Sequence, residues 1–332
     1  MDFMTKKRIL SVEDLRTYFF TRAGVIKAVD GISFTVDEGE SLGIAGESGC
    51  GKSITCLSLV RLVPQPAGRI VSGKILFEGQ DILTKKEEEM RQWRGKVIAM
   101  ILQDPLTSLN PCYTIGNQVS EPFKLEKGNN QRKNIKEQAI DVLRSVNIPM
   151  PERRMNDYPF QFSGGMRQRV LAAIAIARNP RLLIADEPTT SLDVTIQDQF
   201  LRLLKDRQKQ NNMGLVMITH DMGIVAETCD RVAIMYAGRI VEIGTVERVF
   251  QSPAHPYTEA LMQALPKIES KSKTLFQIKG EPPNLLQLPS GCSFWPRCHK
   301  VIDICRIEFP PTIPVASGGE AACWLLQKNK DK

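Results

Sequence analysis

A glycine-rich stretch near the N-terminus has the residue types and the spacing of a phosphate-binding loop. Its residues are Gly46-Glu47-Ser48-Gly49-Cys50-Gly51-Lys52-Ser53, which match the pattern G-x-x-x-x-G-K-S/T. Residues 41–45 before it are typical of a buried strand, and residues 54–62 after it are typical of an amphipathic helix. Glycines allow successive backbone N–H groups to point at phosphate oxygens, and the helix N-terminus adds positive charge. The loop predicts nucleotide binding, with Lys52 at the β- and γ-phosphates and Ser53 on Mg²⁺.

Two acidic residues, Asp186 and Glu187, directly follow a second buried strand at residues 182–185. A carboxylate at the end of such a strand can bind Mg²⁺ beside a phosphate loop, and the next carboxylate can orient or deprotonate the attacking water. A strand that merely ends in acids is common by itself, but it is improbable as a coincidence alongside the loop. We therefore assign Asp186 to the metal and Glu187 to the role of general base.

Two more polar residues follow predicted buried strands. Gln103 comes after residues 97–102, and an amide at that place can contact both the metal and the lytic water. His220 comes after residues 215–219 and can donate a hydrogen bond to charge that develops on the γ-phosphate. A lone histidine is usually structural, so this assignment depends on the neighbouring motifs.

A second stretch of small residues, Phe162-Ser163-Gly164-Gly165-Met166-Arg167-Gln168-Arg169, opens a predicted helix. Small residues at a helix N-terminus form an anion site. The phosphate loop already serves the chain's own nucleotide. A second anion site needs another ligand. The site at Ser163, Gly164, Gly165 and Gln168 is therefore expected to contact the γ-phosphate of a nucleotide that a partner subunit binds.

The elements that must position these residues indicate an α/β fold. The chain has 332 residues, of which 42% are apolar and 24% charged, as in a globular protein with a substantial core. Alternating patterns predict antiparallel strands at residues 8–14, 32–38 and 74–78, and a hairpin at residues 231–242. A helical insertion, about residues 104–178, separates the core strands. We expect a P-loop NTPase with a mixed sheet, an antiparallel β subdomain and a helical subdomain.

The composition changes after residue 251, where proline, glycine and cysteine become more frequent. We therefore predict a nucleotide-binding domain at residues 1–251 and a loop-rich extension at residues 252–332, with a short helix near residues 256–264. The extension contains Cys292, Cys298, Cys305 and Cys323, which lack the short spacings usual for structural zinc. Four thiolates suit a 4Fe-4S cluster. Zinc and unliganded thiols remain alternatives, and His299 could replace one ligand.

Charge and hydropathy bear on the cellular setting. The formal net charge is +7, but the basic residues are spread out and no basic stripe interleaved with aromatic residues occurs, so we expect no nucleic acid partner. No stretch approaches the roughly 18 apolar residues that a spanning helix needs, and the first residues lack the apolar segment of a signal peptide. We expect a protein that is cytosolic, or one that is peripheral on the cytoplasmic face of the cell membrane.

Taken in order, the motifs resemble those of the nucleotide-binding subunits of ATP-binding cassette (ABC) transporters: GESGCGKS, LQDP, FSGGMRQR, LLIADEPT, Ser191-Leu192-Asp193 and ITHD. The resemblance covers about residues 8–250. It implies that Gln103 is the Q-loop residue, Ser163-Gly164-Gly165 the signature, Asp193 a D-loop residue and His220 the switch histidine. It also implies a head-to-tail dimer that holds two ATP molecules, and an aromatic residue stacked on adenine. Phe19 is our choice, with Tyr18 and Phe20 as its neighbours and core packing as an equal reading.

Further stretches are similar to the oligopeptide, dipeptide and nickel importers: DPLTSLNP from residue 104, HPYT from residue 255, EPPNL from residue 281, and Gly291-Cys292 through Arg297-Cys298. The N-terminal half looks closer to the D-type ATPase subunit. The resemblance then implies a heterodimer with an F-type ATPase, two permease subunits, an extracytoplasmic substrate-binding protein and a 4Fe-4S cluster. A nickel chelate or an oligosaccharide is an alternative cargo to peptides.

Two rival classes remain. One is a soluble ABC ATPase of translation, DNA repair or chromosome organisation, but this chain has one cassette and a compact insertion. The other is a regulatory subunit that does not hydrolyse ATP. The presence of Glu187, His220 and an intact signature argues against it.

Overall fold

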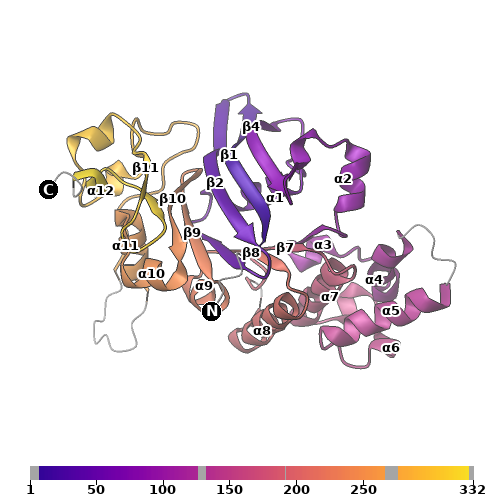
Figure 1. Ribbon diagram of the computed structural model, residues 1–332. Helices are drawn as coiled ribbons and strands as arrows, with labels where there is room; N and C mark the ends of the chain where they lie inside the picture. Colours follow the sequence, from indigo (N-terminus) through magenta and orange to yellow (C-terminus); the bar gives the residue numbers. More distant parts are fainter. Residues whose placement is uncertain (1–6, 126–131, 191, 266–275, 329–332) are drawn as a thin grey trace. The chain divides into compact units, whose positions relative to one another are not determined.

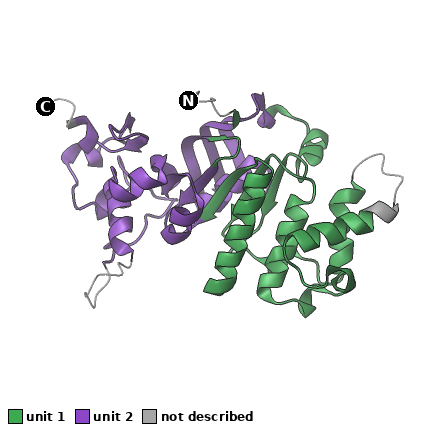
Figure 2. Cartoon of the chain, turned by 60° about the horizontal axis from the view of Figure 1, so that its bottom comes forward, with its two compact units in different colours: residues 1–9, 36–40, 84–218 green, residues 10–35, 41–83, 219–332 purple. Residues whose placement is uncertain are grey.

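The computed structural model describes residues 7–125, 132–190, 192–265 and 276–328. The chain divides into two compact units, which Figure 2 shows in different colours. Unit 1 comprises residues 1–9, 36–40 and 84–218, and unit 2 comprises residues 10–35, 41–83 and 219–332. The chain passes repeatedly from one unit to the other, so neither unit is one continuous segment.

Unit 2 contains most of an antiparallel sheet near the N-terminus (Figure 1). Its strands are β1 (Arg8–Thr21), β2 (Gly24–Asp37), β4 (Gly68–Phe77) and β5 (Gln80–Asp81), in the order β2-β1-β4-β5. The three predicted strands are present but longer than expected. In β1 the register with β4 shifts between Glu13 and Arg16, and Asp14 has a φ of 45°. This bulge interrupts the alternation of side chains, so a period-2 pattern ends there although the strand continues.

A second set of strands in unit 2 carries the phosphate loop. Strand β3 (Ser41–Ala45) pairs in parallel with β9 (Arg231–Tyr236), and β9 pairs antiparallel with β10 (Arg239–Thr245) through the predicted hairpin. Ala237 and Gly238 at the hairpin turn have φ values of 48° and 81°, as a two-residue type I′ turn requires. Two short strands of the extension, β12 (Glu320–Ala322) and β11 (Thr312–Pro314), continue the same sheet beyond β10.

The helices of unit 2 are short. They are α1 (Lys52–Leu59), α9 (Met222–Thr228), α10 (Val246–Gln251), α11 (Pro256–Ala264) and α12 (Leu325–Lys328), with 3₁₀ turns η3 (Trp295–Arg297) and η4 (Asp303–Arg306). The helix predicted near residues 256–264 is thus confirmed. One apolar cluster contains Ile234 and Tyr236 of β9 together with Tyr257 of α11 and Phe294 of the extension. The extension and the strands beside the phosphate loop therefore share a core.

Unit 1 is built on three parallel strands, β6 (Ile98–Ile101), β7 (Leu182–Asp186) and β8 (Gly214–Thr219), with β7 in the middle. Every residue of β7 and β8 is buried, as their continuous apolar stretches predict. The turn η1 (Ile82–Thr84) lies where the chain passes from unit 2 into unit 1. The helices and 3₁₀ turn of unit 1 are α2 (Glu87–Trp93), α3 (Pro105–Ser108), α4 (Ile115–Lys124), α5 (Arg132–Ser145), α6 (Pro151–Arg154), η2 (Pro159–Gln161), α7 (Gly164–Ile176) and α8 (Val194–Gln210). Helices α4, α5 and α7 pack together, which confirms a helical insertion between the strands (Figure 1).

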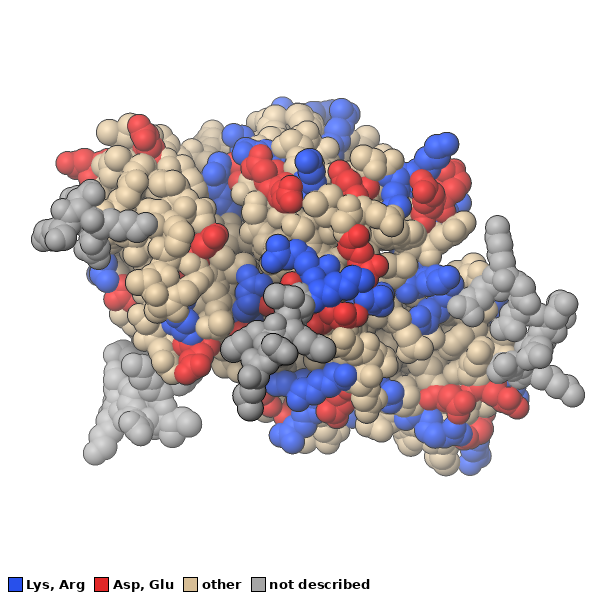
Figure 3. All heavy atoms as spheres, viewed as in Figure 1, with Lys and Arg blue, Asp and Glu red and all other residues tan. Residues whose placement is uncertain are grey.

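The division at residue 251 stays a prediction, because the two compact units follow other boundaries. Basic and acidic side chains lie interspersed over the face shown in Figure 3, in keeping with a spread-out positive charge. No helix in the described part of the chain has both the length and the apolar character needed to cross a membrane.

Candidate functional site

The phosphate loop joins the buried strand β3 to helix α1, as the sequence predicts. Gly51, immediately before the helix, has a φ of 108°. A Cβ atom on Gly51 would lie 2.1 Å from the carbonyl oxygen of Ala28, and one on Gly46 would lie 2.1 Å from that of Met235. Both are far below a contact distance, so only glycine fits, and the neighbouring strands fix the path of the loop. Ser48 and Gly49 are exposed at its tip, whereas Cys50 is buried beneath it.

Lys52 starts helix α1 and lies against the loop that it serves. Its ammonium group donates to the carbonyl oxygens of Gly46 (2.8 Å) and Glu47 (3.0 Å), and its residue is only 4% exposed. Ser53 follows in the first turn of the helix and is half-buried. The ammonium group and the hydroxyl predicted to contact phosphates and Mg²⁺ thus occupy consecutive positions at the N-terminus of one helix.

The predicted catalytic carboxylate lies at the end of β7 in unit 1. Glu187 accepts hydrogen bonds from the Gln103 amide (2.9 Å) and from the Thr190 hydroxyl (3.1 Å). Its own backbone N–H donates to the Ile218 carbonyl oxygen of β8 (2.9 Å). Glu187 has a φ of 43°, a strained conformation for a residue with a side chain. The structure therefore brings Gln103 and Glu187 into direct contact although they are 84 positions apart.

Asp186 precedes Glu187 as the last residue of β7 and is 5% exposed. His220 follows β8 directly and is exposed. These positions at strand ends are those expected from the sequence. The roles in metal binding and γ-phosphate contact stay predictions.

The signature stretch opens helix α7. The Ser163 hydroxyl caps the helix by accepting from the backbone N–H of Met166 (3.3 Å), and Ser163 and Gly164 are exposed. A Cβ atom on Gly165 would lie 2.6 Å from Ile196 of α8, so glycine allows these helices to approach closely. Gln168 is instead 1% exposed, and no hydrogen bond within the described part of the chain satisfies its amide. In this structure its side chain lies inside the unit, so its predicted role at the partner's nucleotide stays a prediction.

The D-loop residue Asp193 is exposed and caps helix α8, where its carboxylate accepts from the backbone N–H of Ile196 (3.1 Å). Ser191, the first residue of that motif, lies outside the described residues.

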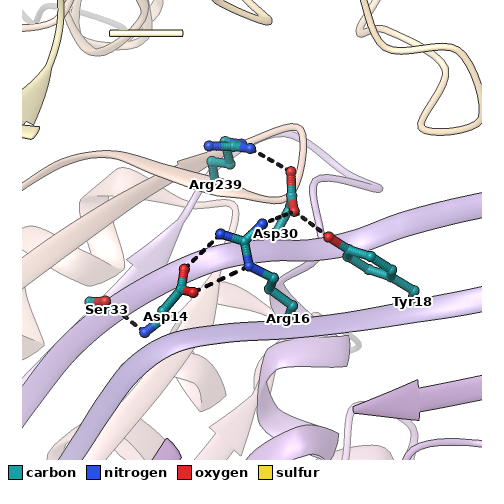
Figure 4. Close-up of polar contacts among 6 residues, drawn as sticks. All are labelled: Asp14, Arg16, Tyr18, Asp30, Ser33 and Arg239. Atoms are coloured by element: carbon teal, nitrogen blue, oxygen red, sulfur yellow. Dashed lines mark hydrogen bonds and ion pairs between the residues drawn. The ribbon is translucent and has the colours of Figure 1, made fainter. Parts of the chain in front are cut away.

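The three aromatic candidates for adenine stacking differ in their contacts. The Tyr18 hydroxyl donates to Asp30 (2.6 Å), which also accepts from Arg16 and Arg239 (Figure 4). Burial alone would raise the pKa of the Asp30 carboxyl, but the Tyr18 hydrogen bond and the charge of Arg239 outweigh it and lower that pKa. Tyr18 therefore serves a structural ion-pair network.

Phe19 and Phe20 point to opposite sides of β1, as consecutive strand residues do. Phe20 is 45% exposed and lies under the Arg69 guanidinium. Phe19 is half-buried, and its ring packs against Gly68, where a Cβ atom would lie 2.8 Å from the ring. The Phe19 ring is thus held by packing and is still partly exposed. Its assignment as the residue that stacks on adenine stays a prediction.

The four cysteines of the extension line one cavity, together with His255, Phe294 and Trp324. The cavity is small in this structure, with a volume of about 10 Å³, which is close to what one water molecule needs. Burial raises the pKa of the Cys292 thiol to about 12 and that of the Cys323 thiol to about 11. Without a bound metal these thiols are therefore protonated at neutral pH.

Across the described residues, no group of three or more His, Cys, Asp or Glu is arranged to hold a metal ion. Four thiols around one cavity are nevertheless the donor set of a 4Fe-4S cluster, in which each ligand binds a different iron. His299 is 51% exposed beside Glu259 and does not line the cavity. The histidine that does is His255, whose pKa burial lowers to about 3.

Sequence reasoning did not single out three residues beside these motifs: His255, Tyr257 and Arg297. All three belong to stretches that resemble the peptide importers, but nothing in their spacing indicates a contact with the phosphate loop. Tyr257 accepts from the backbone N–H of Glu47 (3.0 Å), and Arg297 pairs with the Glu47 carboxylate.

Three features together define a nucleotide-binding cassette of the ABC class. They are the phosphate loop, the Asp-Glu pair at a strand end with its glutamine, and the capped signature helix. The family model for ABC transporters matches residues 29–190. The model for the C-terminal region of oligopeptide/dipeptide transporters matches residues 241–305. The second match covers three of the four cysteines of the extension.

Relatives match over nearly the whole chain. The chain is 48% identical over 327 residues to the oligopeptide transport ATP-binding protein OppD of Bacillus subtilis, covering 98% of this chain and 91% of the relative. It is 46% identical over 315 residues to the dipeptide transport ATP-binding protein DppD of Escherichia coli, covering 95% and 96%. The chain therefore belongs to the oligopeptide/dipeptide family of ABC transporter ATP-binding proteins.

Solved structures show the same fold. The dimeric bacterial ABC transporter cassette MJ0796 has a TM-score of 0.65 at 24% identity and covers 72% of this chain and 99% of its own. The protein cbiO1 from Clostridium perfringens, part of the transporter complex cbiONQ, has a TM-score of 0.63 at 27% identity and covers 74% and 92%. Neither match covers the whole chain.

Proposed function

We propose that this chain is an ATPase subunit that powers the import of peptides through an ABC transporter. The observation that carries the proposal is the position of Glu187 next to Asp186 at the end of β7. Its carboxylate accepts hydrogen bonds from the Gln103 amide and from the Thr190 hydroxyl. Lys52 binds the β- and γ-phosphates, Ser53, Gln103 and Asp186 supply oxygen ligands suited to Mg²⁺, and Glu187 accepts the proton of the attacking water. The names of the relatives, which are peptide transport proteins, support peptides as the cargo.

The partner is a second ATPase subunit in a head-to-tail dimer. Ser163, Gly164 and Asp193 are exposed at helix N-termini, as residues that face a partner's nucleotide must be. The resemblance to D-type subunits supports a heterodimer with an F-type ATPase. Two permease subunits and an extracytoplasmic binding protein complete the transporter, and this chain acts at the cytoplasmic face of the membrane. Peptide entry then follows the opening and closing of the ATPase dimer.

The extension holds a 4Fe-4S cluster through Cys292, Cys298, Cys305 and Cys323. The common cavity supports this assignment. Because the thiols of Cys292 and Cys323 have raised pKa values, binding the cluster must displace protons from them. Bound there, the cluster would cross-link loops that otherwise have little regular structure.

Two measurements on the purified chain test these proposals. Equilibrium binding of a fluorescent ATP analogue with Mg²⁺ should be strong for the natural chain and lost in Lys52→Ala, whereas Lys136→Ala, an exposed lysine of α5, should bind normally. Binding that survives Lys52→Ala would contradict the site. Protein purified without oxygen should contain about four irons and four sulfides per chain. Zinc alone, or no metal, would contradict the cluster.

A further inference from the structure

An ion pair joins the cysteine-containing part of the extension to the phosphate loop. The Arg297 guanidinium donates to both carboxylate oxygens of Glu47, at 2.6 Å and 2.9 Å. The Arg297 side chain is only 5% exposed and that of Glu47 is 25% exposed. Two parallel hydrogen bonds from one guanidinium fix the direction as well as the charge of the carboxylate. The residues are 250 positions apart, so the contact exists only in the folded chain.

Glu47 is held through its backbone as well. Its N–H donates to the Tyr257 hydroxyl (3.0 Å), and its carbonyl oxygen accepts from the Lys52 ammonium group (3.0 Å). A single loop residue therefore contacts two parts of the extension, α11 through its N–H and Arg297 through its side chain, and it contacts the phosphate-binding lysine through its carbonyl. Any movement of Glu47 would move the acceptor that Lys52 uses.

Arg297 itself is rigidly placed. It ends the turn η3 and directly precedes Cys298. Its Nε donates to the Lys279 carbonyl oxygen (3.2 Å), and one terminal nitrogen also donates to the Tyr236 hydroxyl (3.3 Å). The Tyr236 ring lies 4.6 Å from the ring of Tyr257 and 5.2 Å from that of Phe294, centroid to centroid. The same aromatic group thus supports both side chains that hold Glu47.

Charge repulsion explains why the Glu47 carboxylate needs a cation beside it. A carboxylate on a loop that binds a polyanion repels the phosphates unless a cation neutralises it or turns it away. The Arg297 fork neutralises the Glu47 carboxylate and holds it in place, while Tyr257 holds the adjoining N–H. The neutralised loop leaves the charge of Lys52 and the N-terminus of α1 to act on the phosphates.

We propose that Arg297 and Tyr257 are positioning residues for ATP, which hold Glu47 so that the phosphate loop keeps its binding conformation. This inference rests on the proposed function. The cysteine-containing extension thereby sets the nucleotide affinity of the cassette. The segment between Cys292 and Cys298 acts on Lys52 through Glu47, without contact with the reacting atoms.

A double-mutant cycle on the full chain tests the coupling. Arg297→Ala should weaken binding of the fluorescent ATP analogue about tenfold, and Arg297→Lys, which keeps the charge, should weaken it less. In a Glu47→Gln background, Arg297→Ala should add little, because its target is already altered. The matched control is Lys300→Ala, which removes a nearby cation that lies just beyond Cys298 and pairs instead with Glu259 (2.6 Å).

Steady-state kinetics separate positioning from chemistry. In the assembled transporter, Arg297→Ala should raise the KM for ATP while kcat changes by less than about twofold. Additive effects of Arg297→Ala and Glu47→Gln, or equal losses in Arg297→Ala and Lys300→Ala, would overturn the inference. If the natural chain binds ATP and Lys52→Ala abolishes that binding while Arg297→Ala leaves it unchanged, the inference fails and the proposed function stands. If the natural chain itself does not bind ATP, the proposed function fails.

Discussion

Replacing Glu187 by glutamine separates ATP binding from ATP hydrolysis. The two side chains have the same shape, and the remaining amide oxygen can still accept the hydrogen bond that Gln103 now donates over 2.9 Å. What is lost is the negative charge and the ability to accept a proton from water. Removing a general base costs a factor of about 10²–10⁴ in rate, and a factor of about 10³ corresponds to about 4 kcal/mol of activation free energy.

The assay is phosphate release by the assembled transporter at saturating ATP, together with equilibrium binding of ATP. Glu187→Gln should keep its ATP affinity within about threefold and lose at least about 99% of its turnover. Glu137→Gln, an exposed carboxylate on α5, is the matched control and should retain both properties. Turnover close to that of the natural protein would refute the role of Glu187 as the base. A loss of affinity equal to the loss of turnover would show that Glu187 acts in binding.

Three further predictions concern the partner's site, the adenine and the ion-pair network. Ser163→Arg should impair turnover at the partner's ATP site more than at the chain's own, measured by trapping nucleotide separately at each site, and equal loss at both would contradict a head-to-tail dimer. Phe19→Ala should weaken ATP binding about tenfold, since base stacking is worth about 1–3 kcal/mol, whereas Phe20→Ala should have little effect, and the reverse order would move the assignment to Phe20. Asp30→Ala should lower the free energy of unfolding, measured by chemical denaturation, by about 3 kcal/mol, because Arg16 and Arg239 lose a common partner that is only 2% exposed. Tyr18→Phe should lower it by only about 1 kcal/mol. Equal losses in the two variants would show that the two arginines do not depend on Asp30.

Local pattern was sufficient for the elements that carry the chemistry. The phosphate loop, the buried strands β7 and β8 and the hairpin at Ala237-Gly238 occur where the sequence predicts them, because each depends on neighbours in the chain. The length of β1 could not be predicted in the same way. Its bulge at Asp14 depends on pairing with β4, which is distant in sequence, and the side-chain alternation changes there.

For single side chains, too, some properties could be predicted from the sequence and others could not. Residue type and order were enough to select Lys52, Gln103, Asp186 and Glu187. They gave no sign that Gln168 is buried, because its exposure depends on how α7 packs. They selected Phe19 for adenine stacking but left its neighbours Tyr18 and Phe20 open, and the hydrogen bond from Tyr18 to Asp30 sets Tyr18 apart from the other two.

The sequence alone determined the class of the protein, since catalysis by a phosphate loop needs a few residue types at short, fixed spacings. Only the tertiary structure decided how the extension relates to that loop. The strands β11 and β12 join the sheet through β10, four cysteines from separate turns line one cavity, and Arg297 pairs with Glu47. Such contacts join residues that are far apart in the chain, and they follow from how whole elements pack, which no local pattern records.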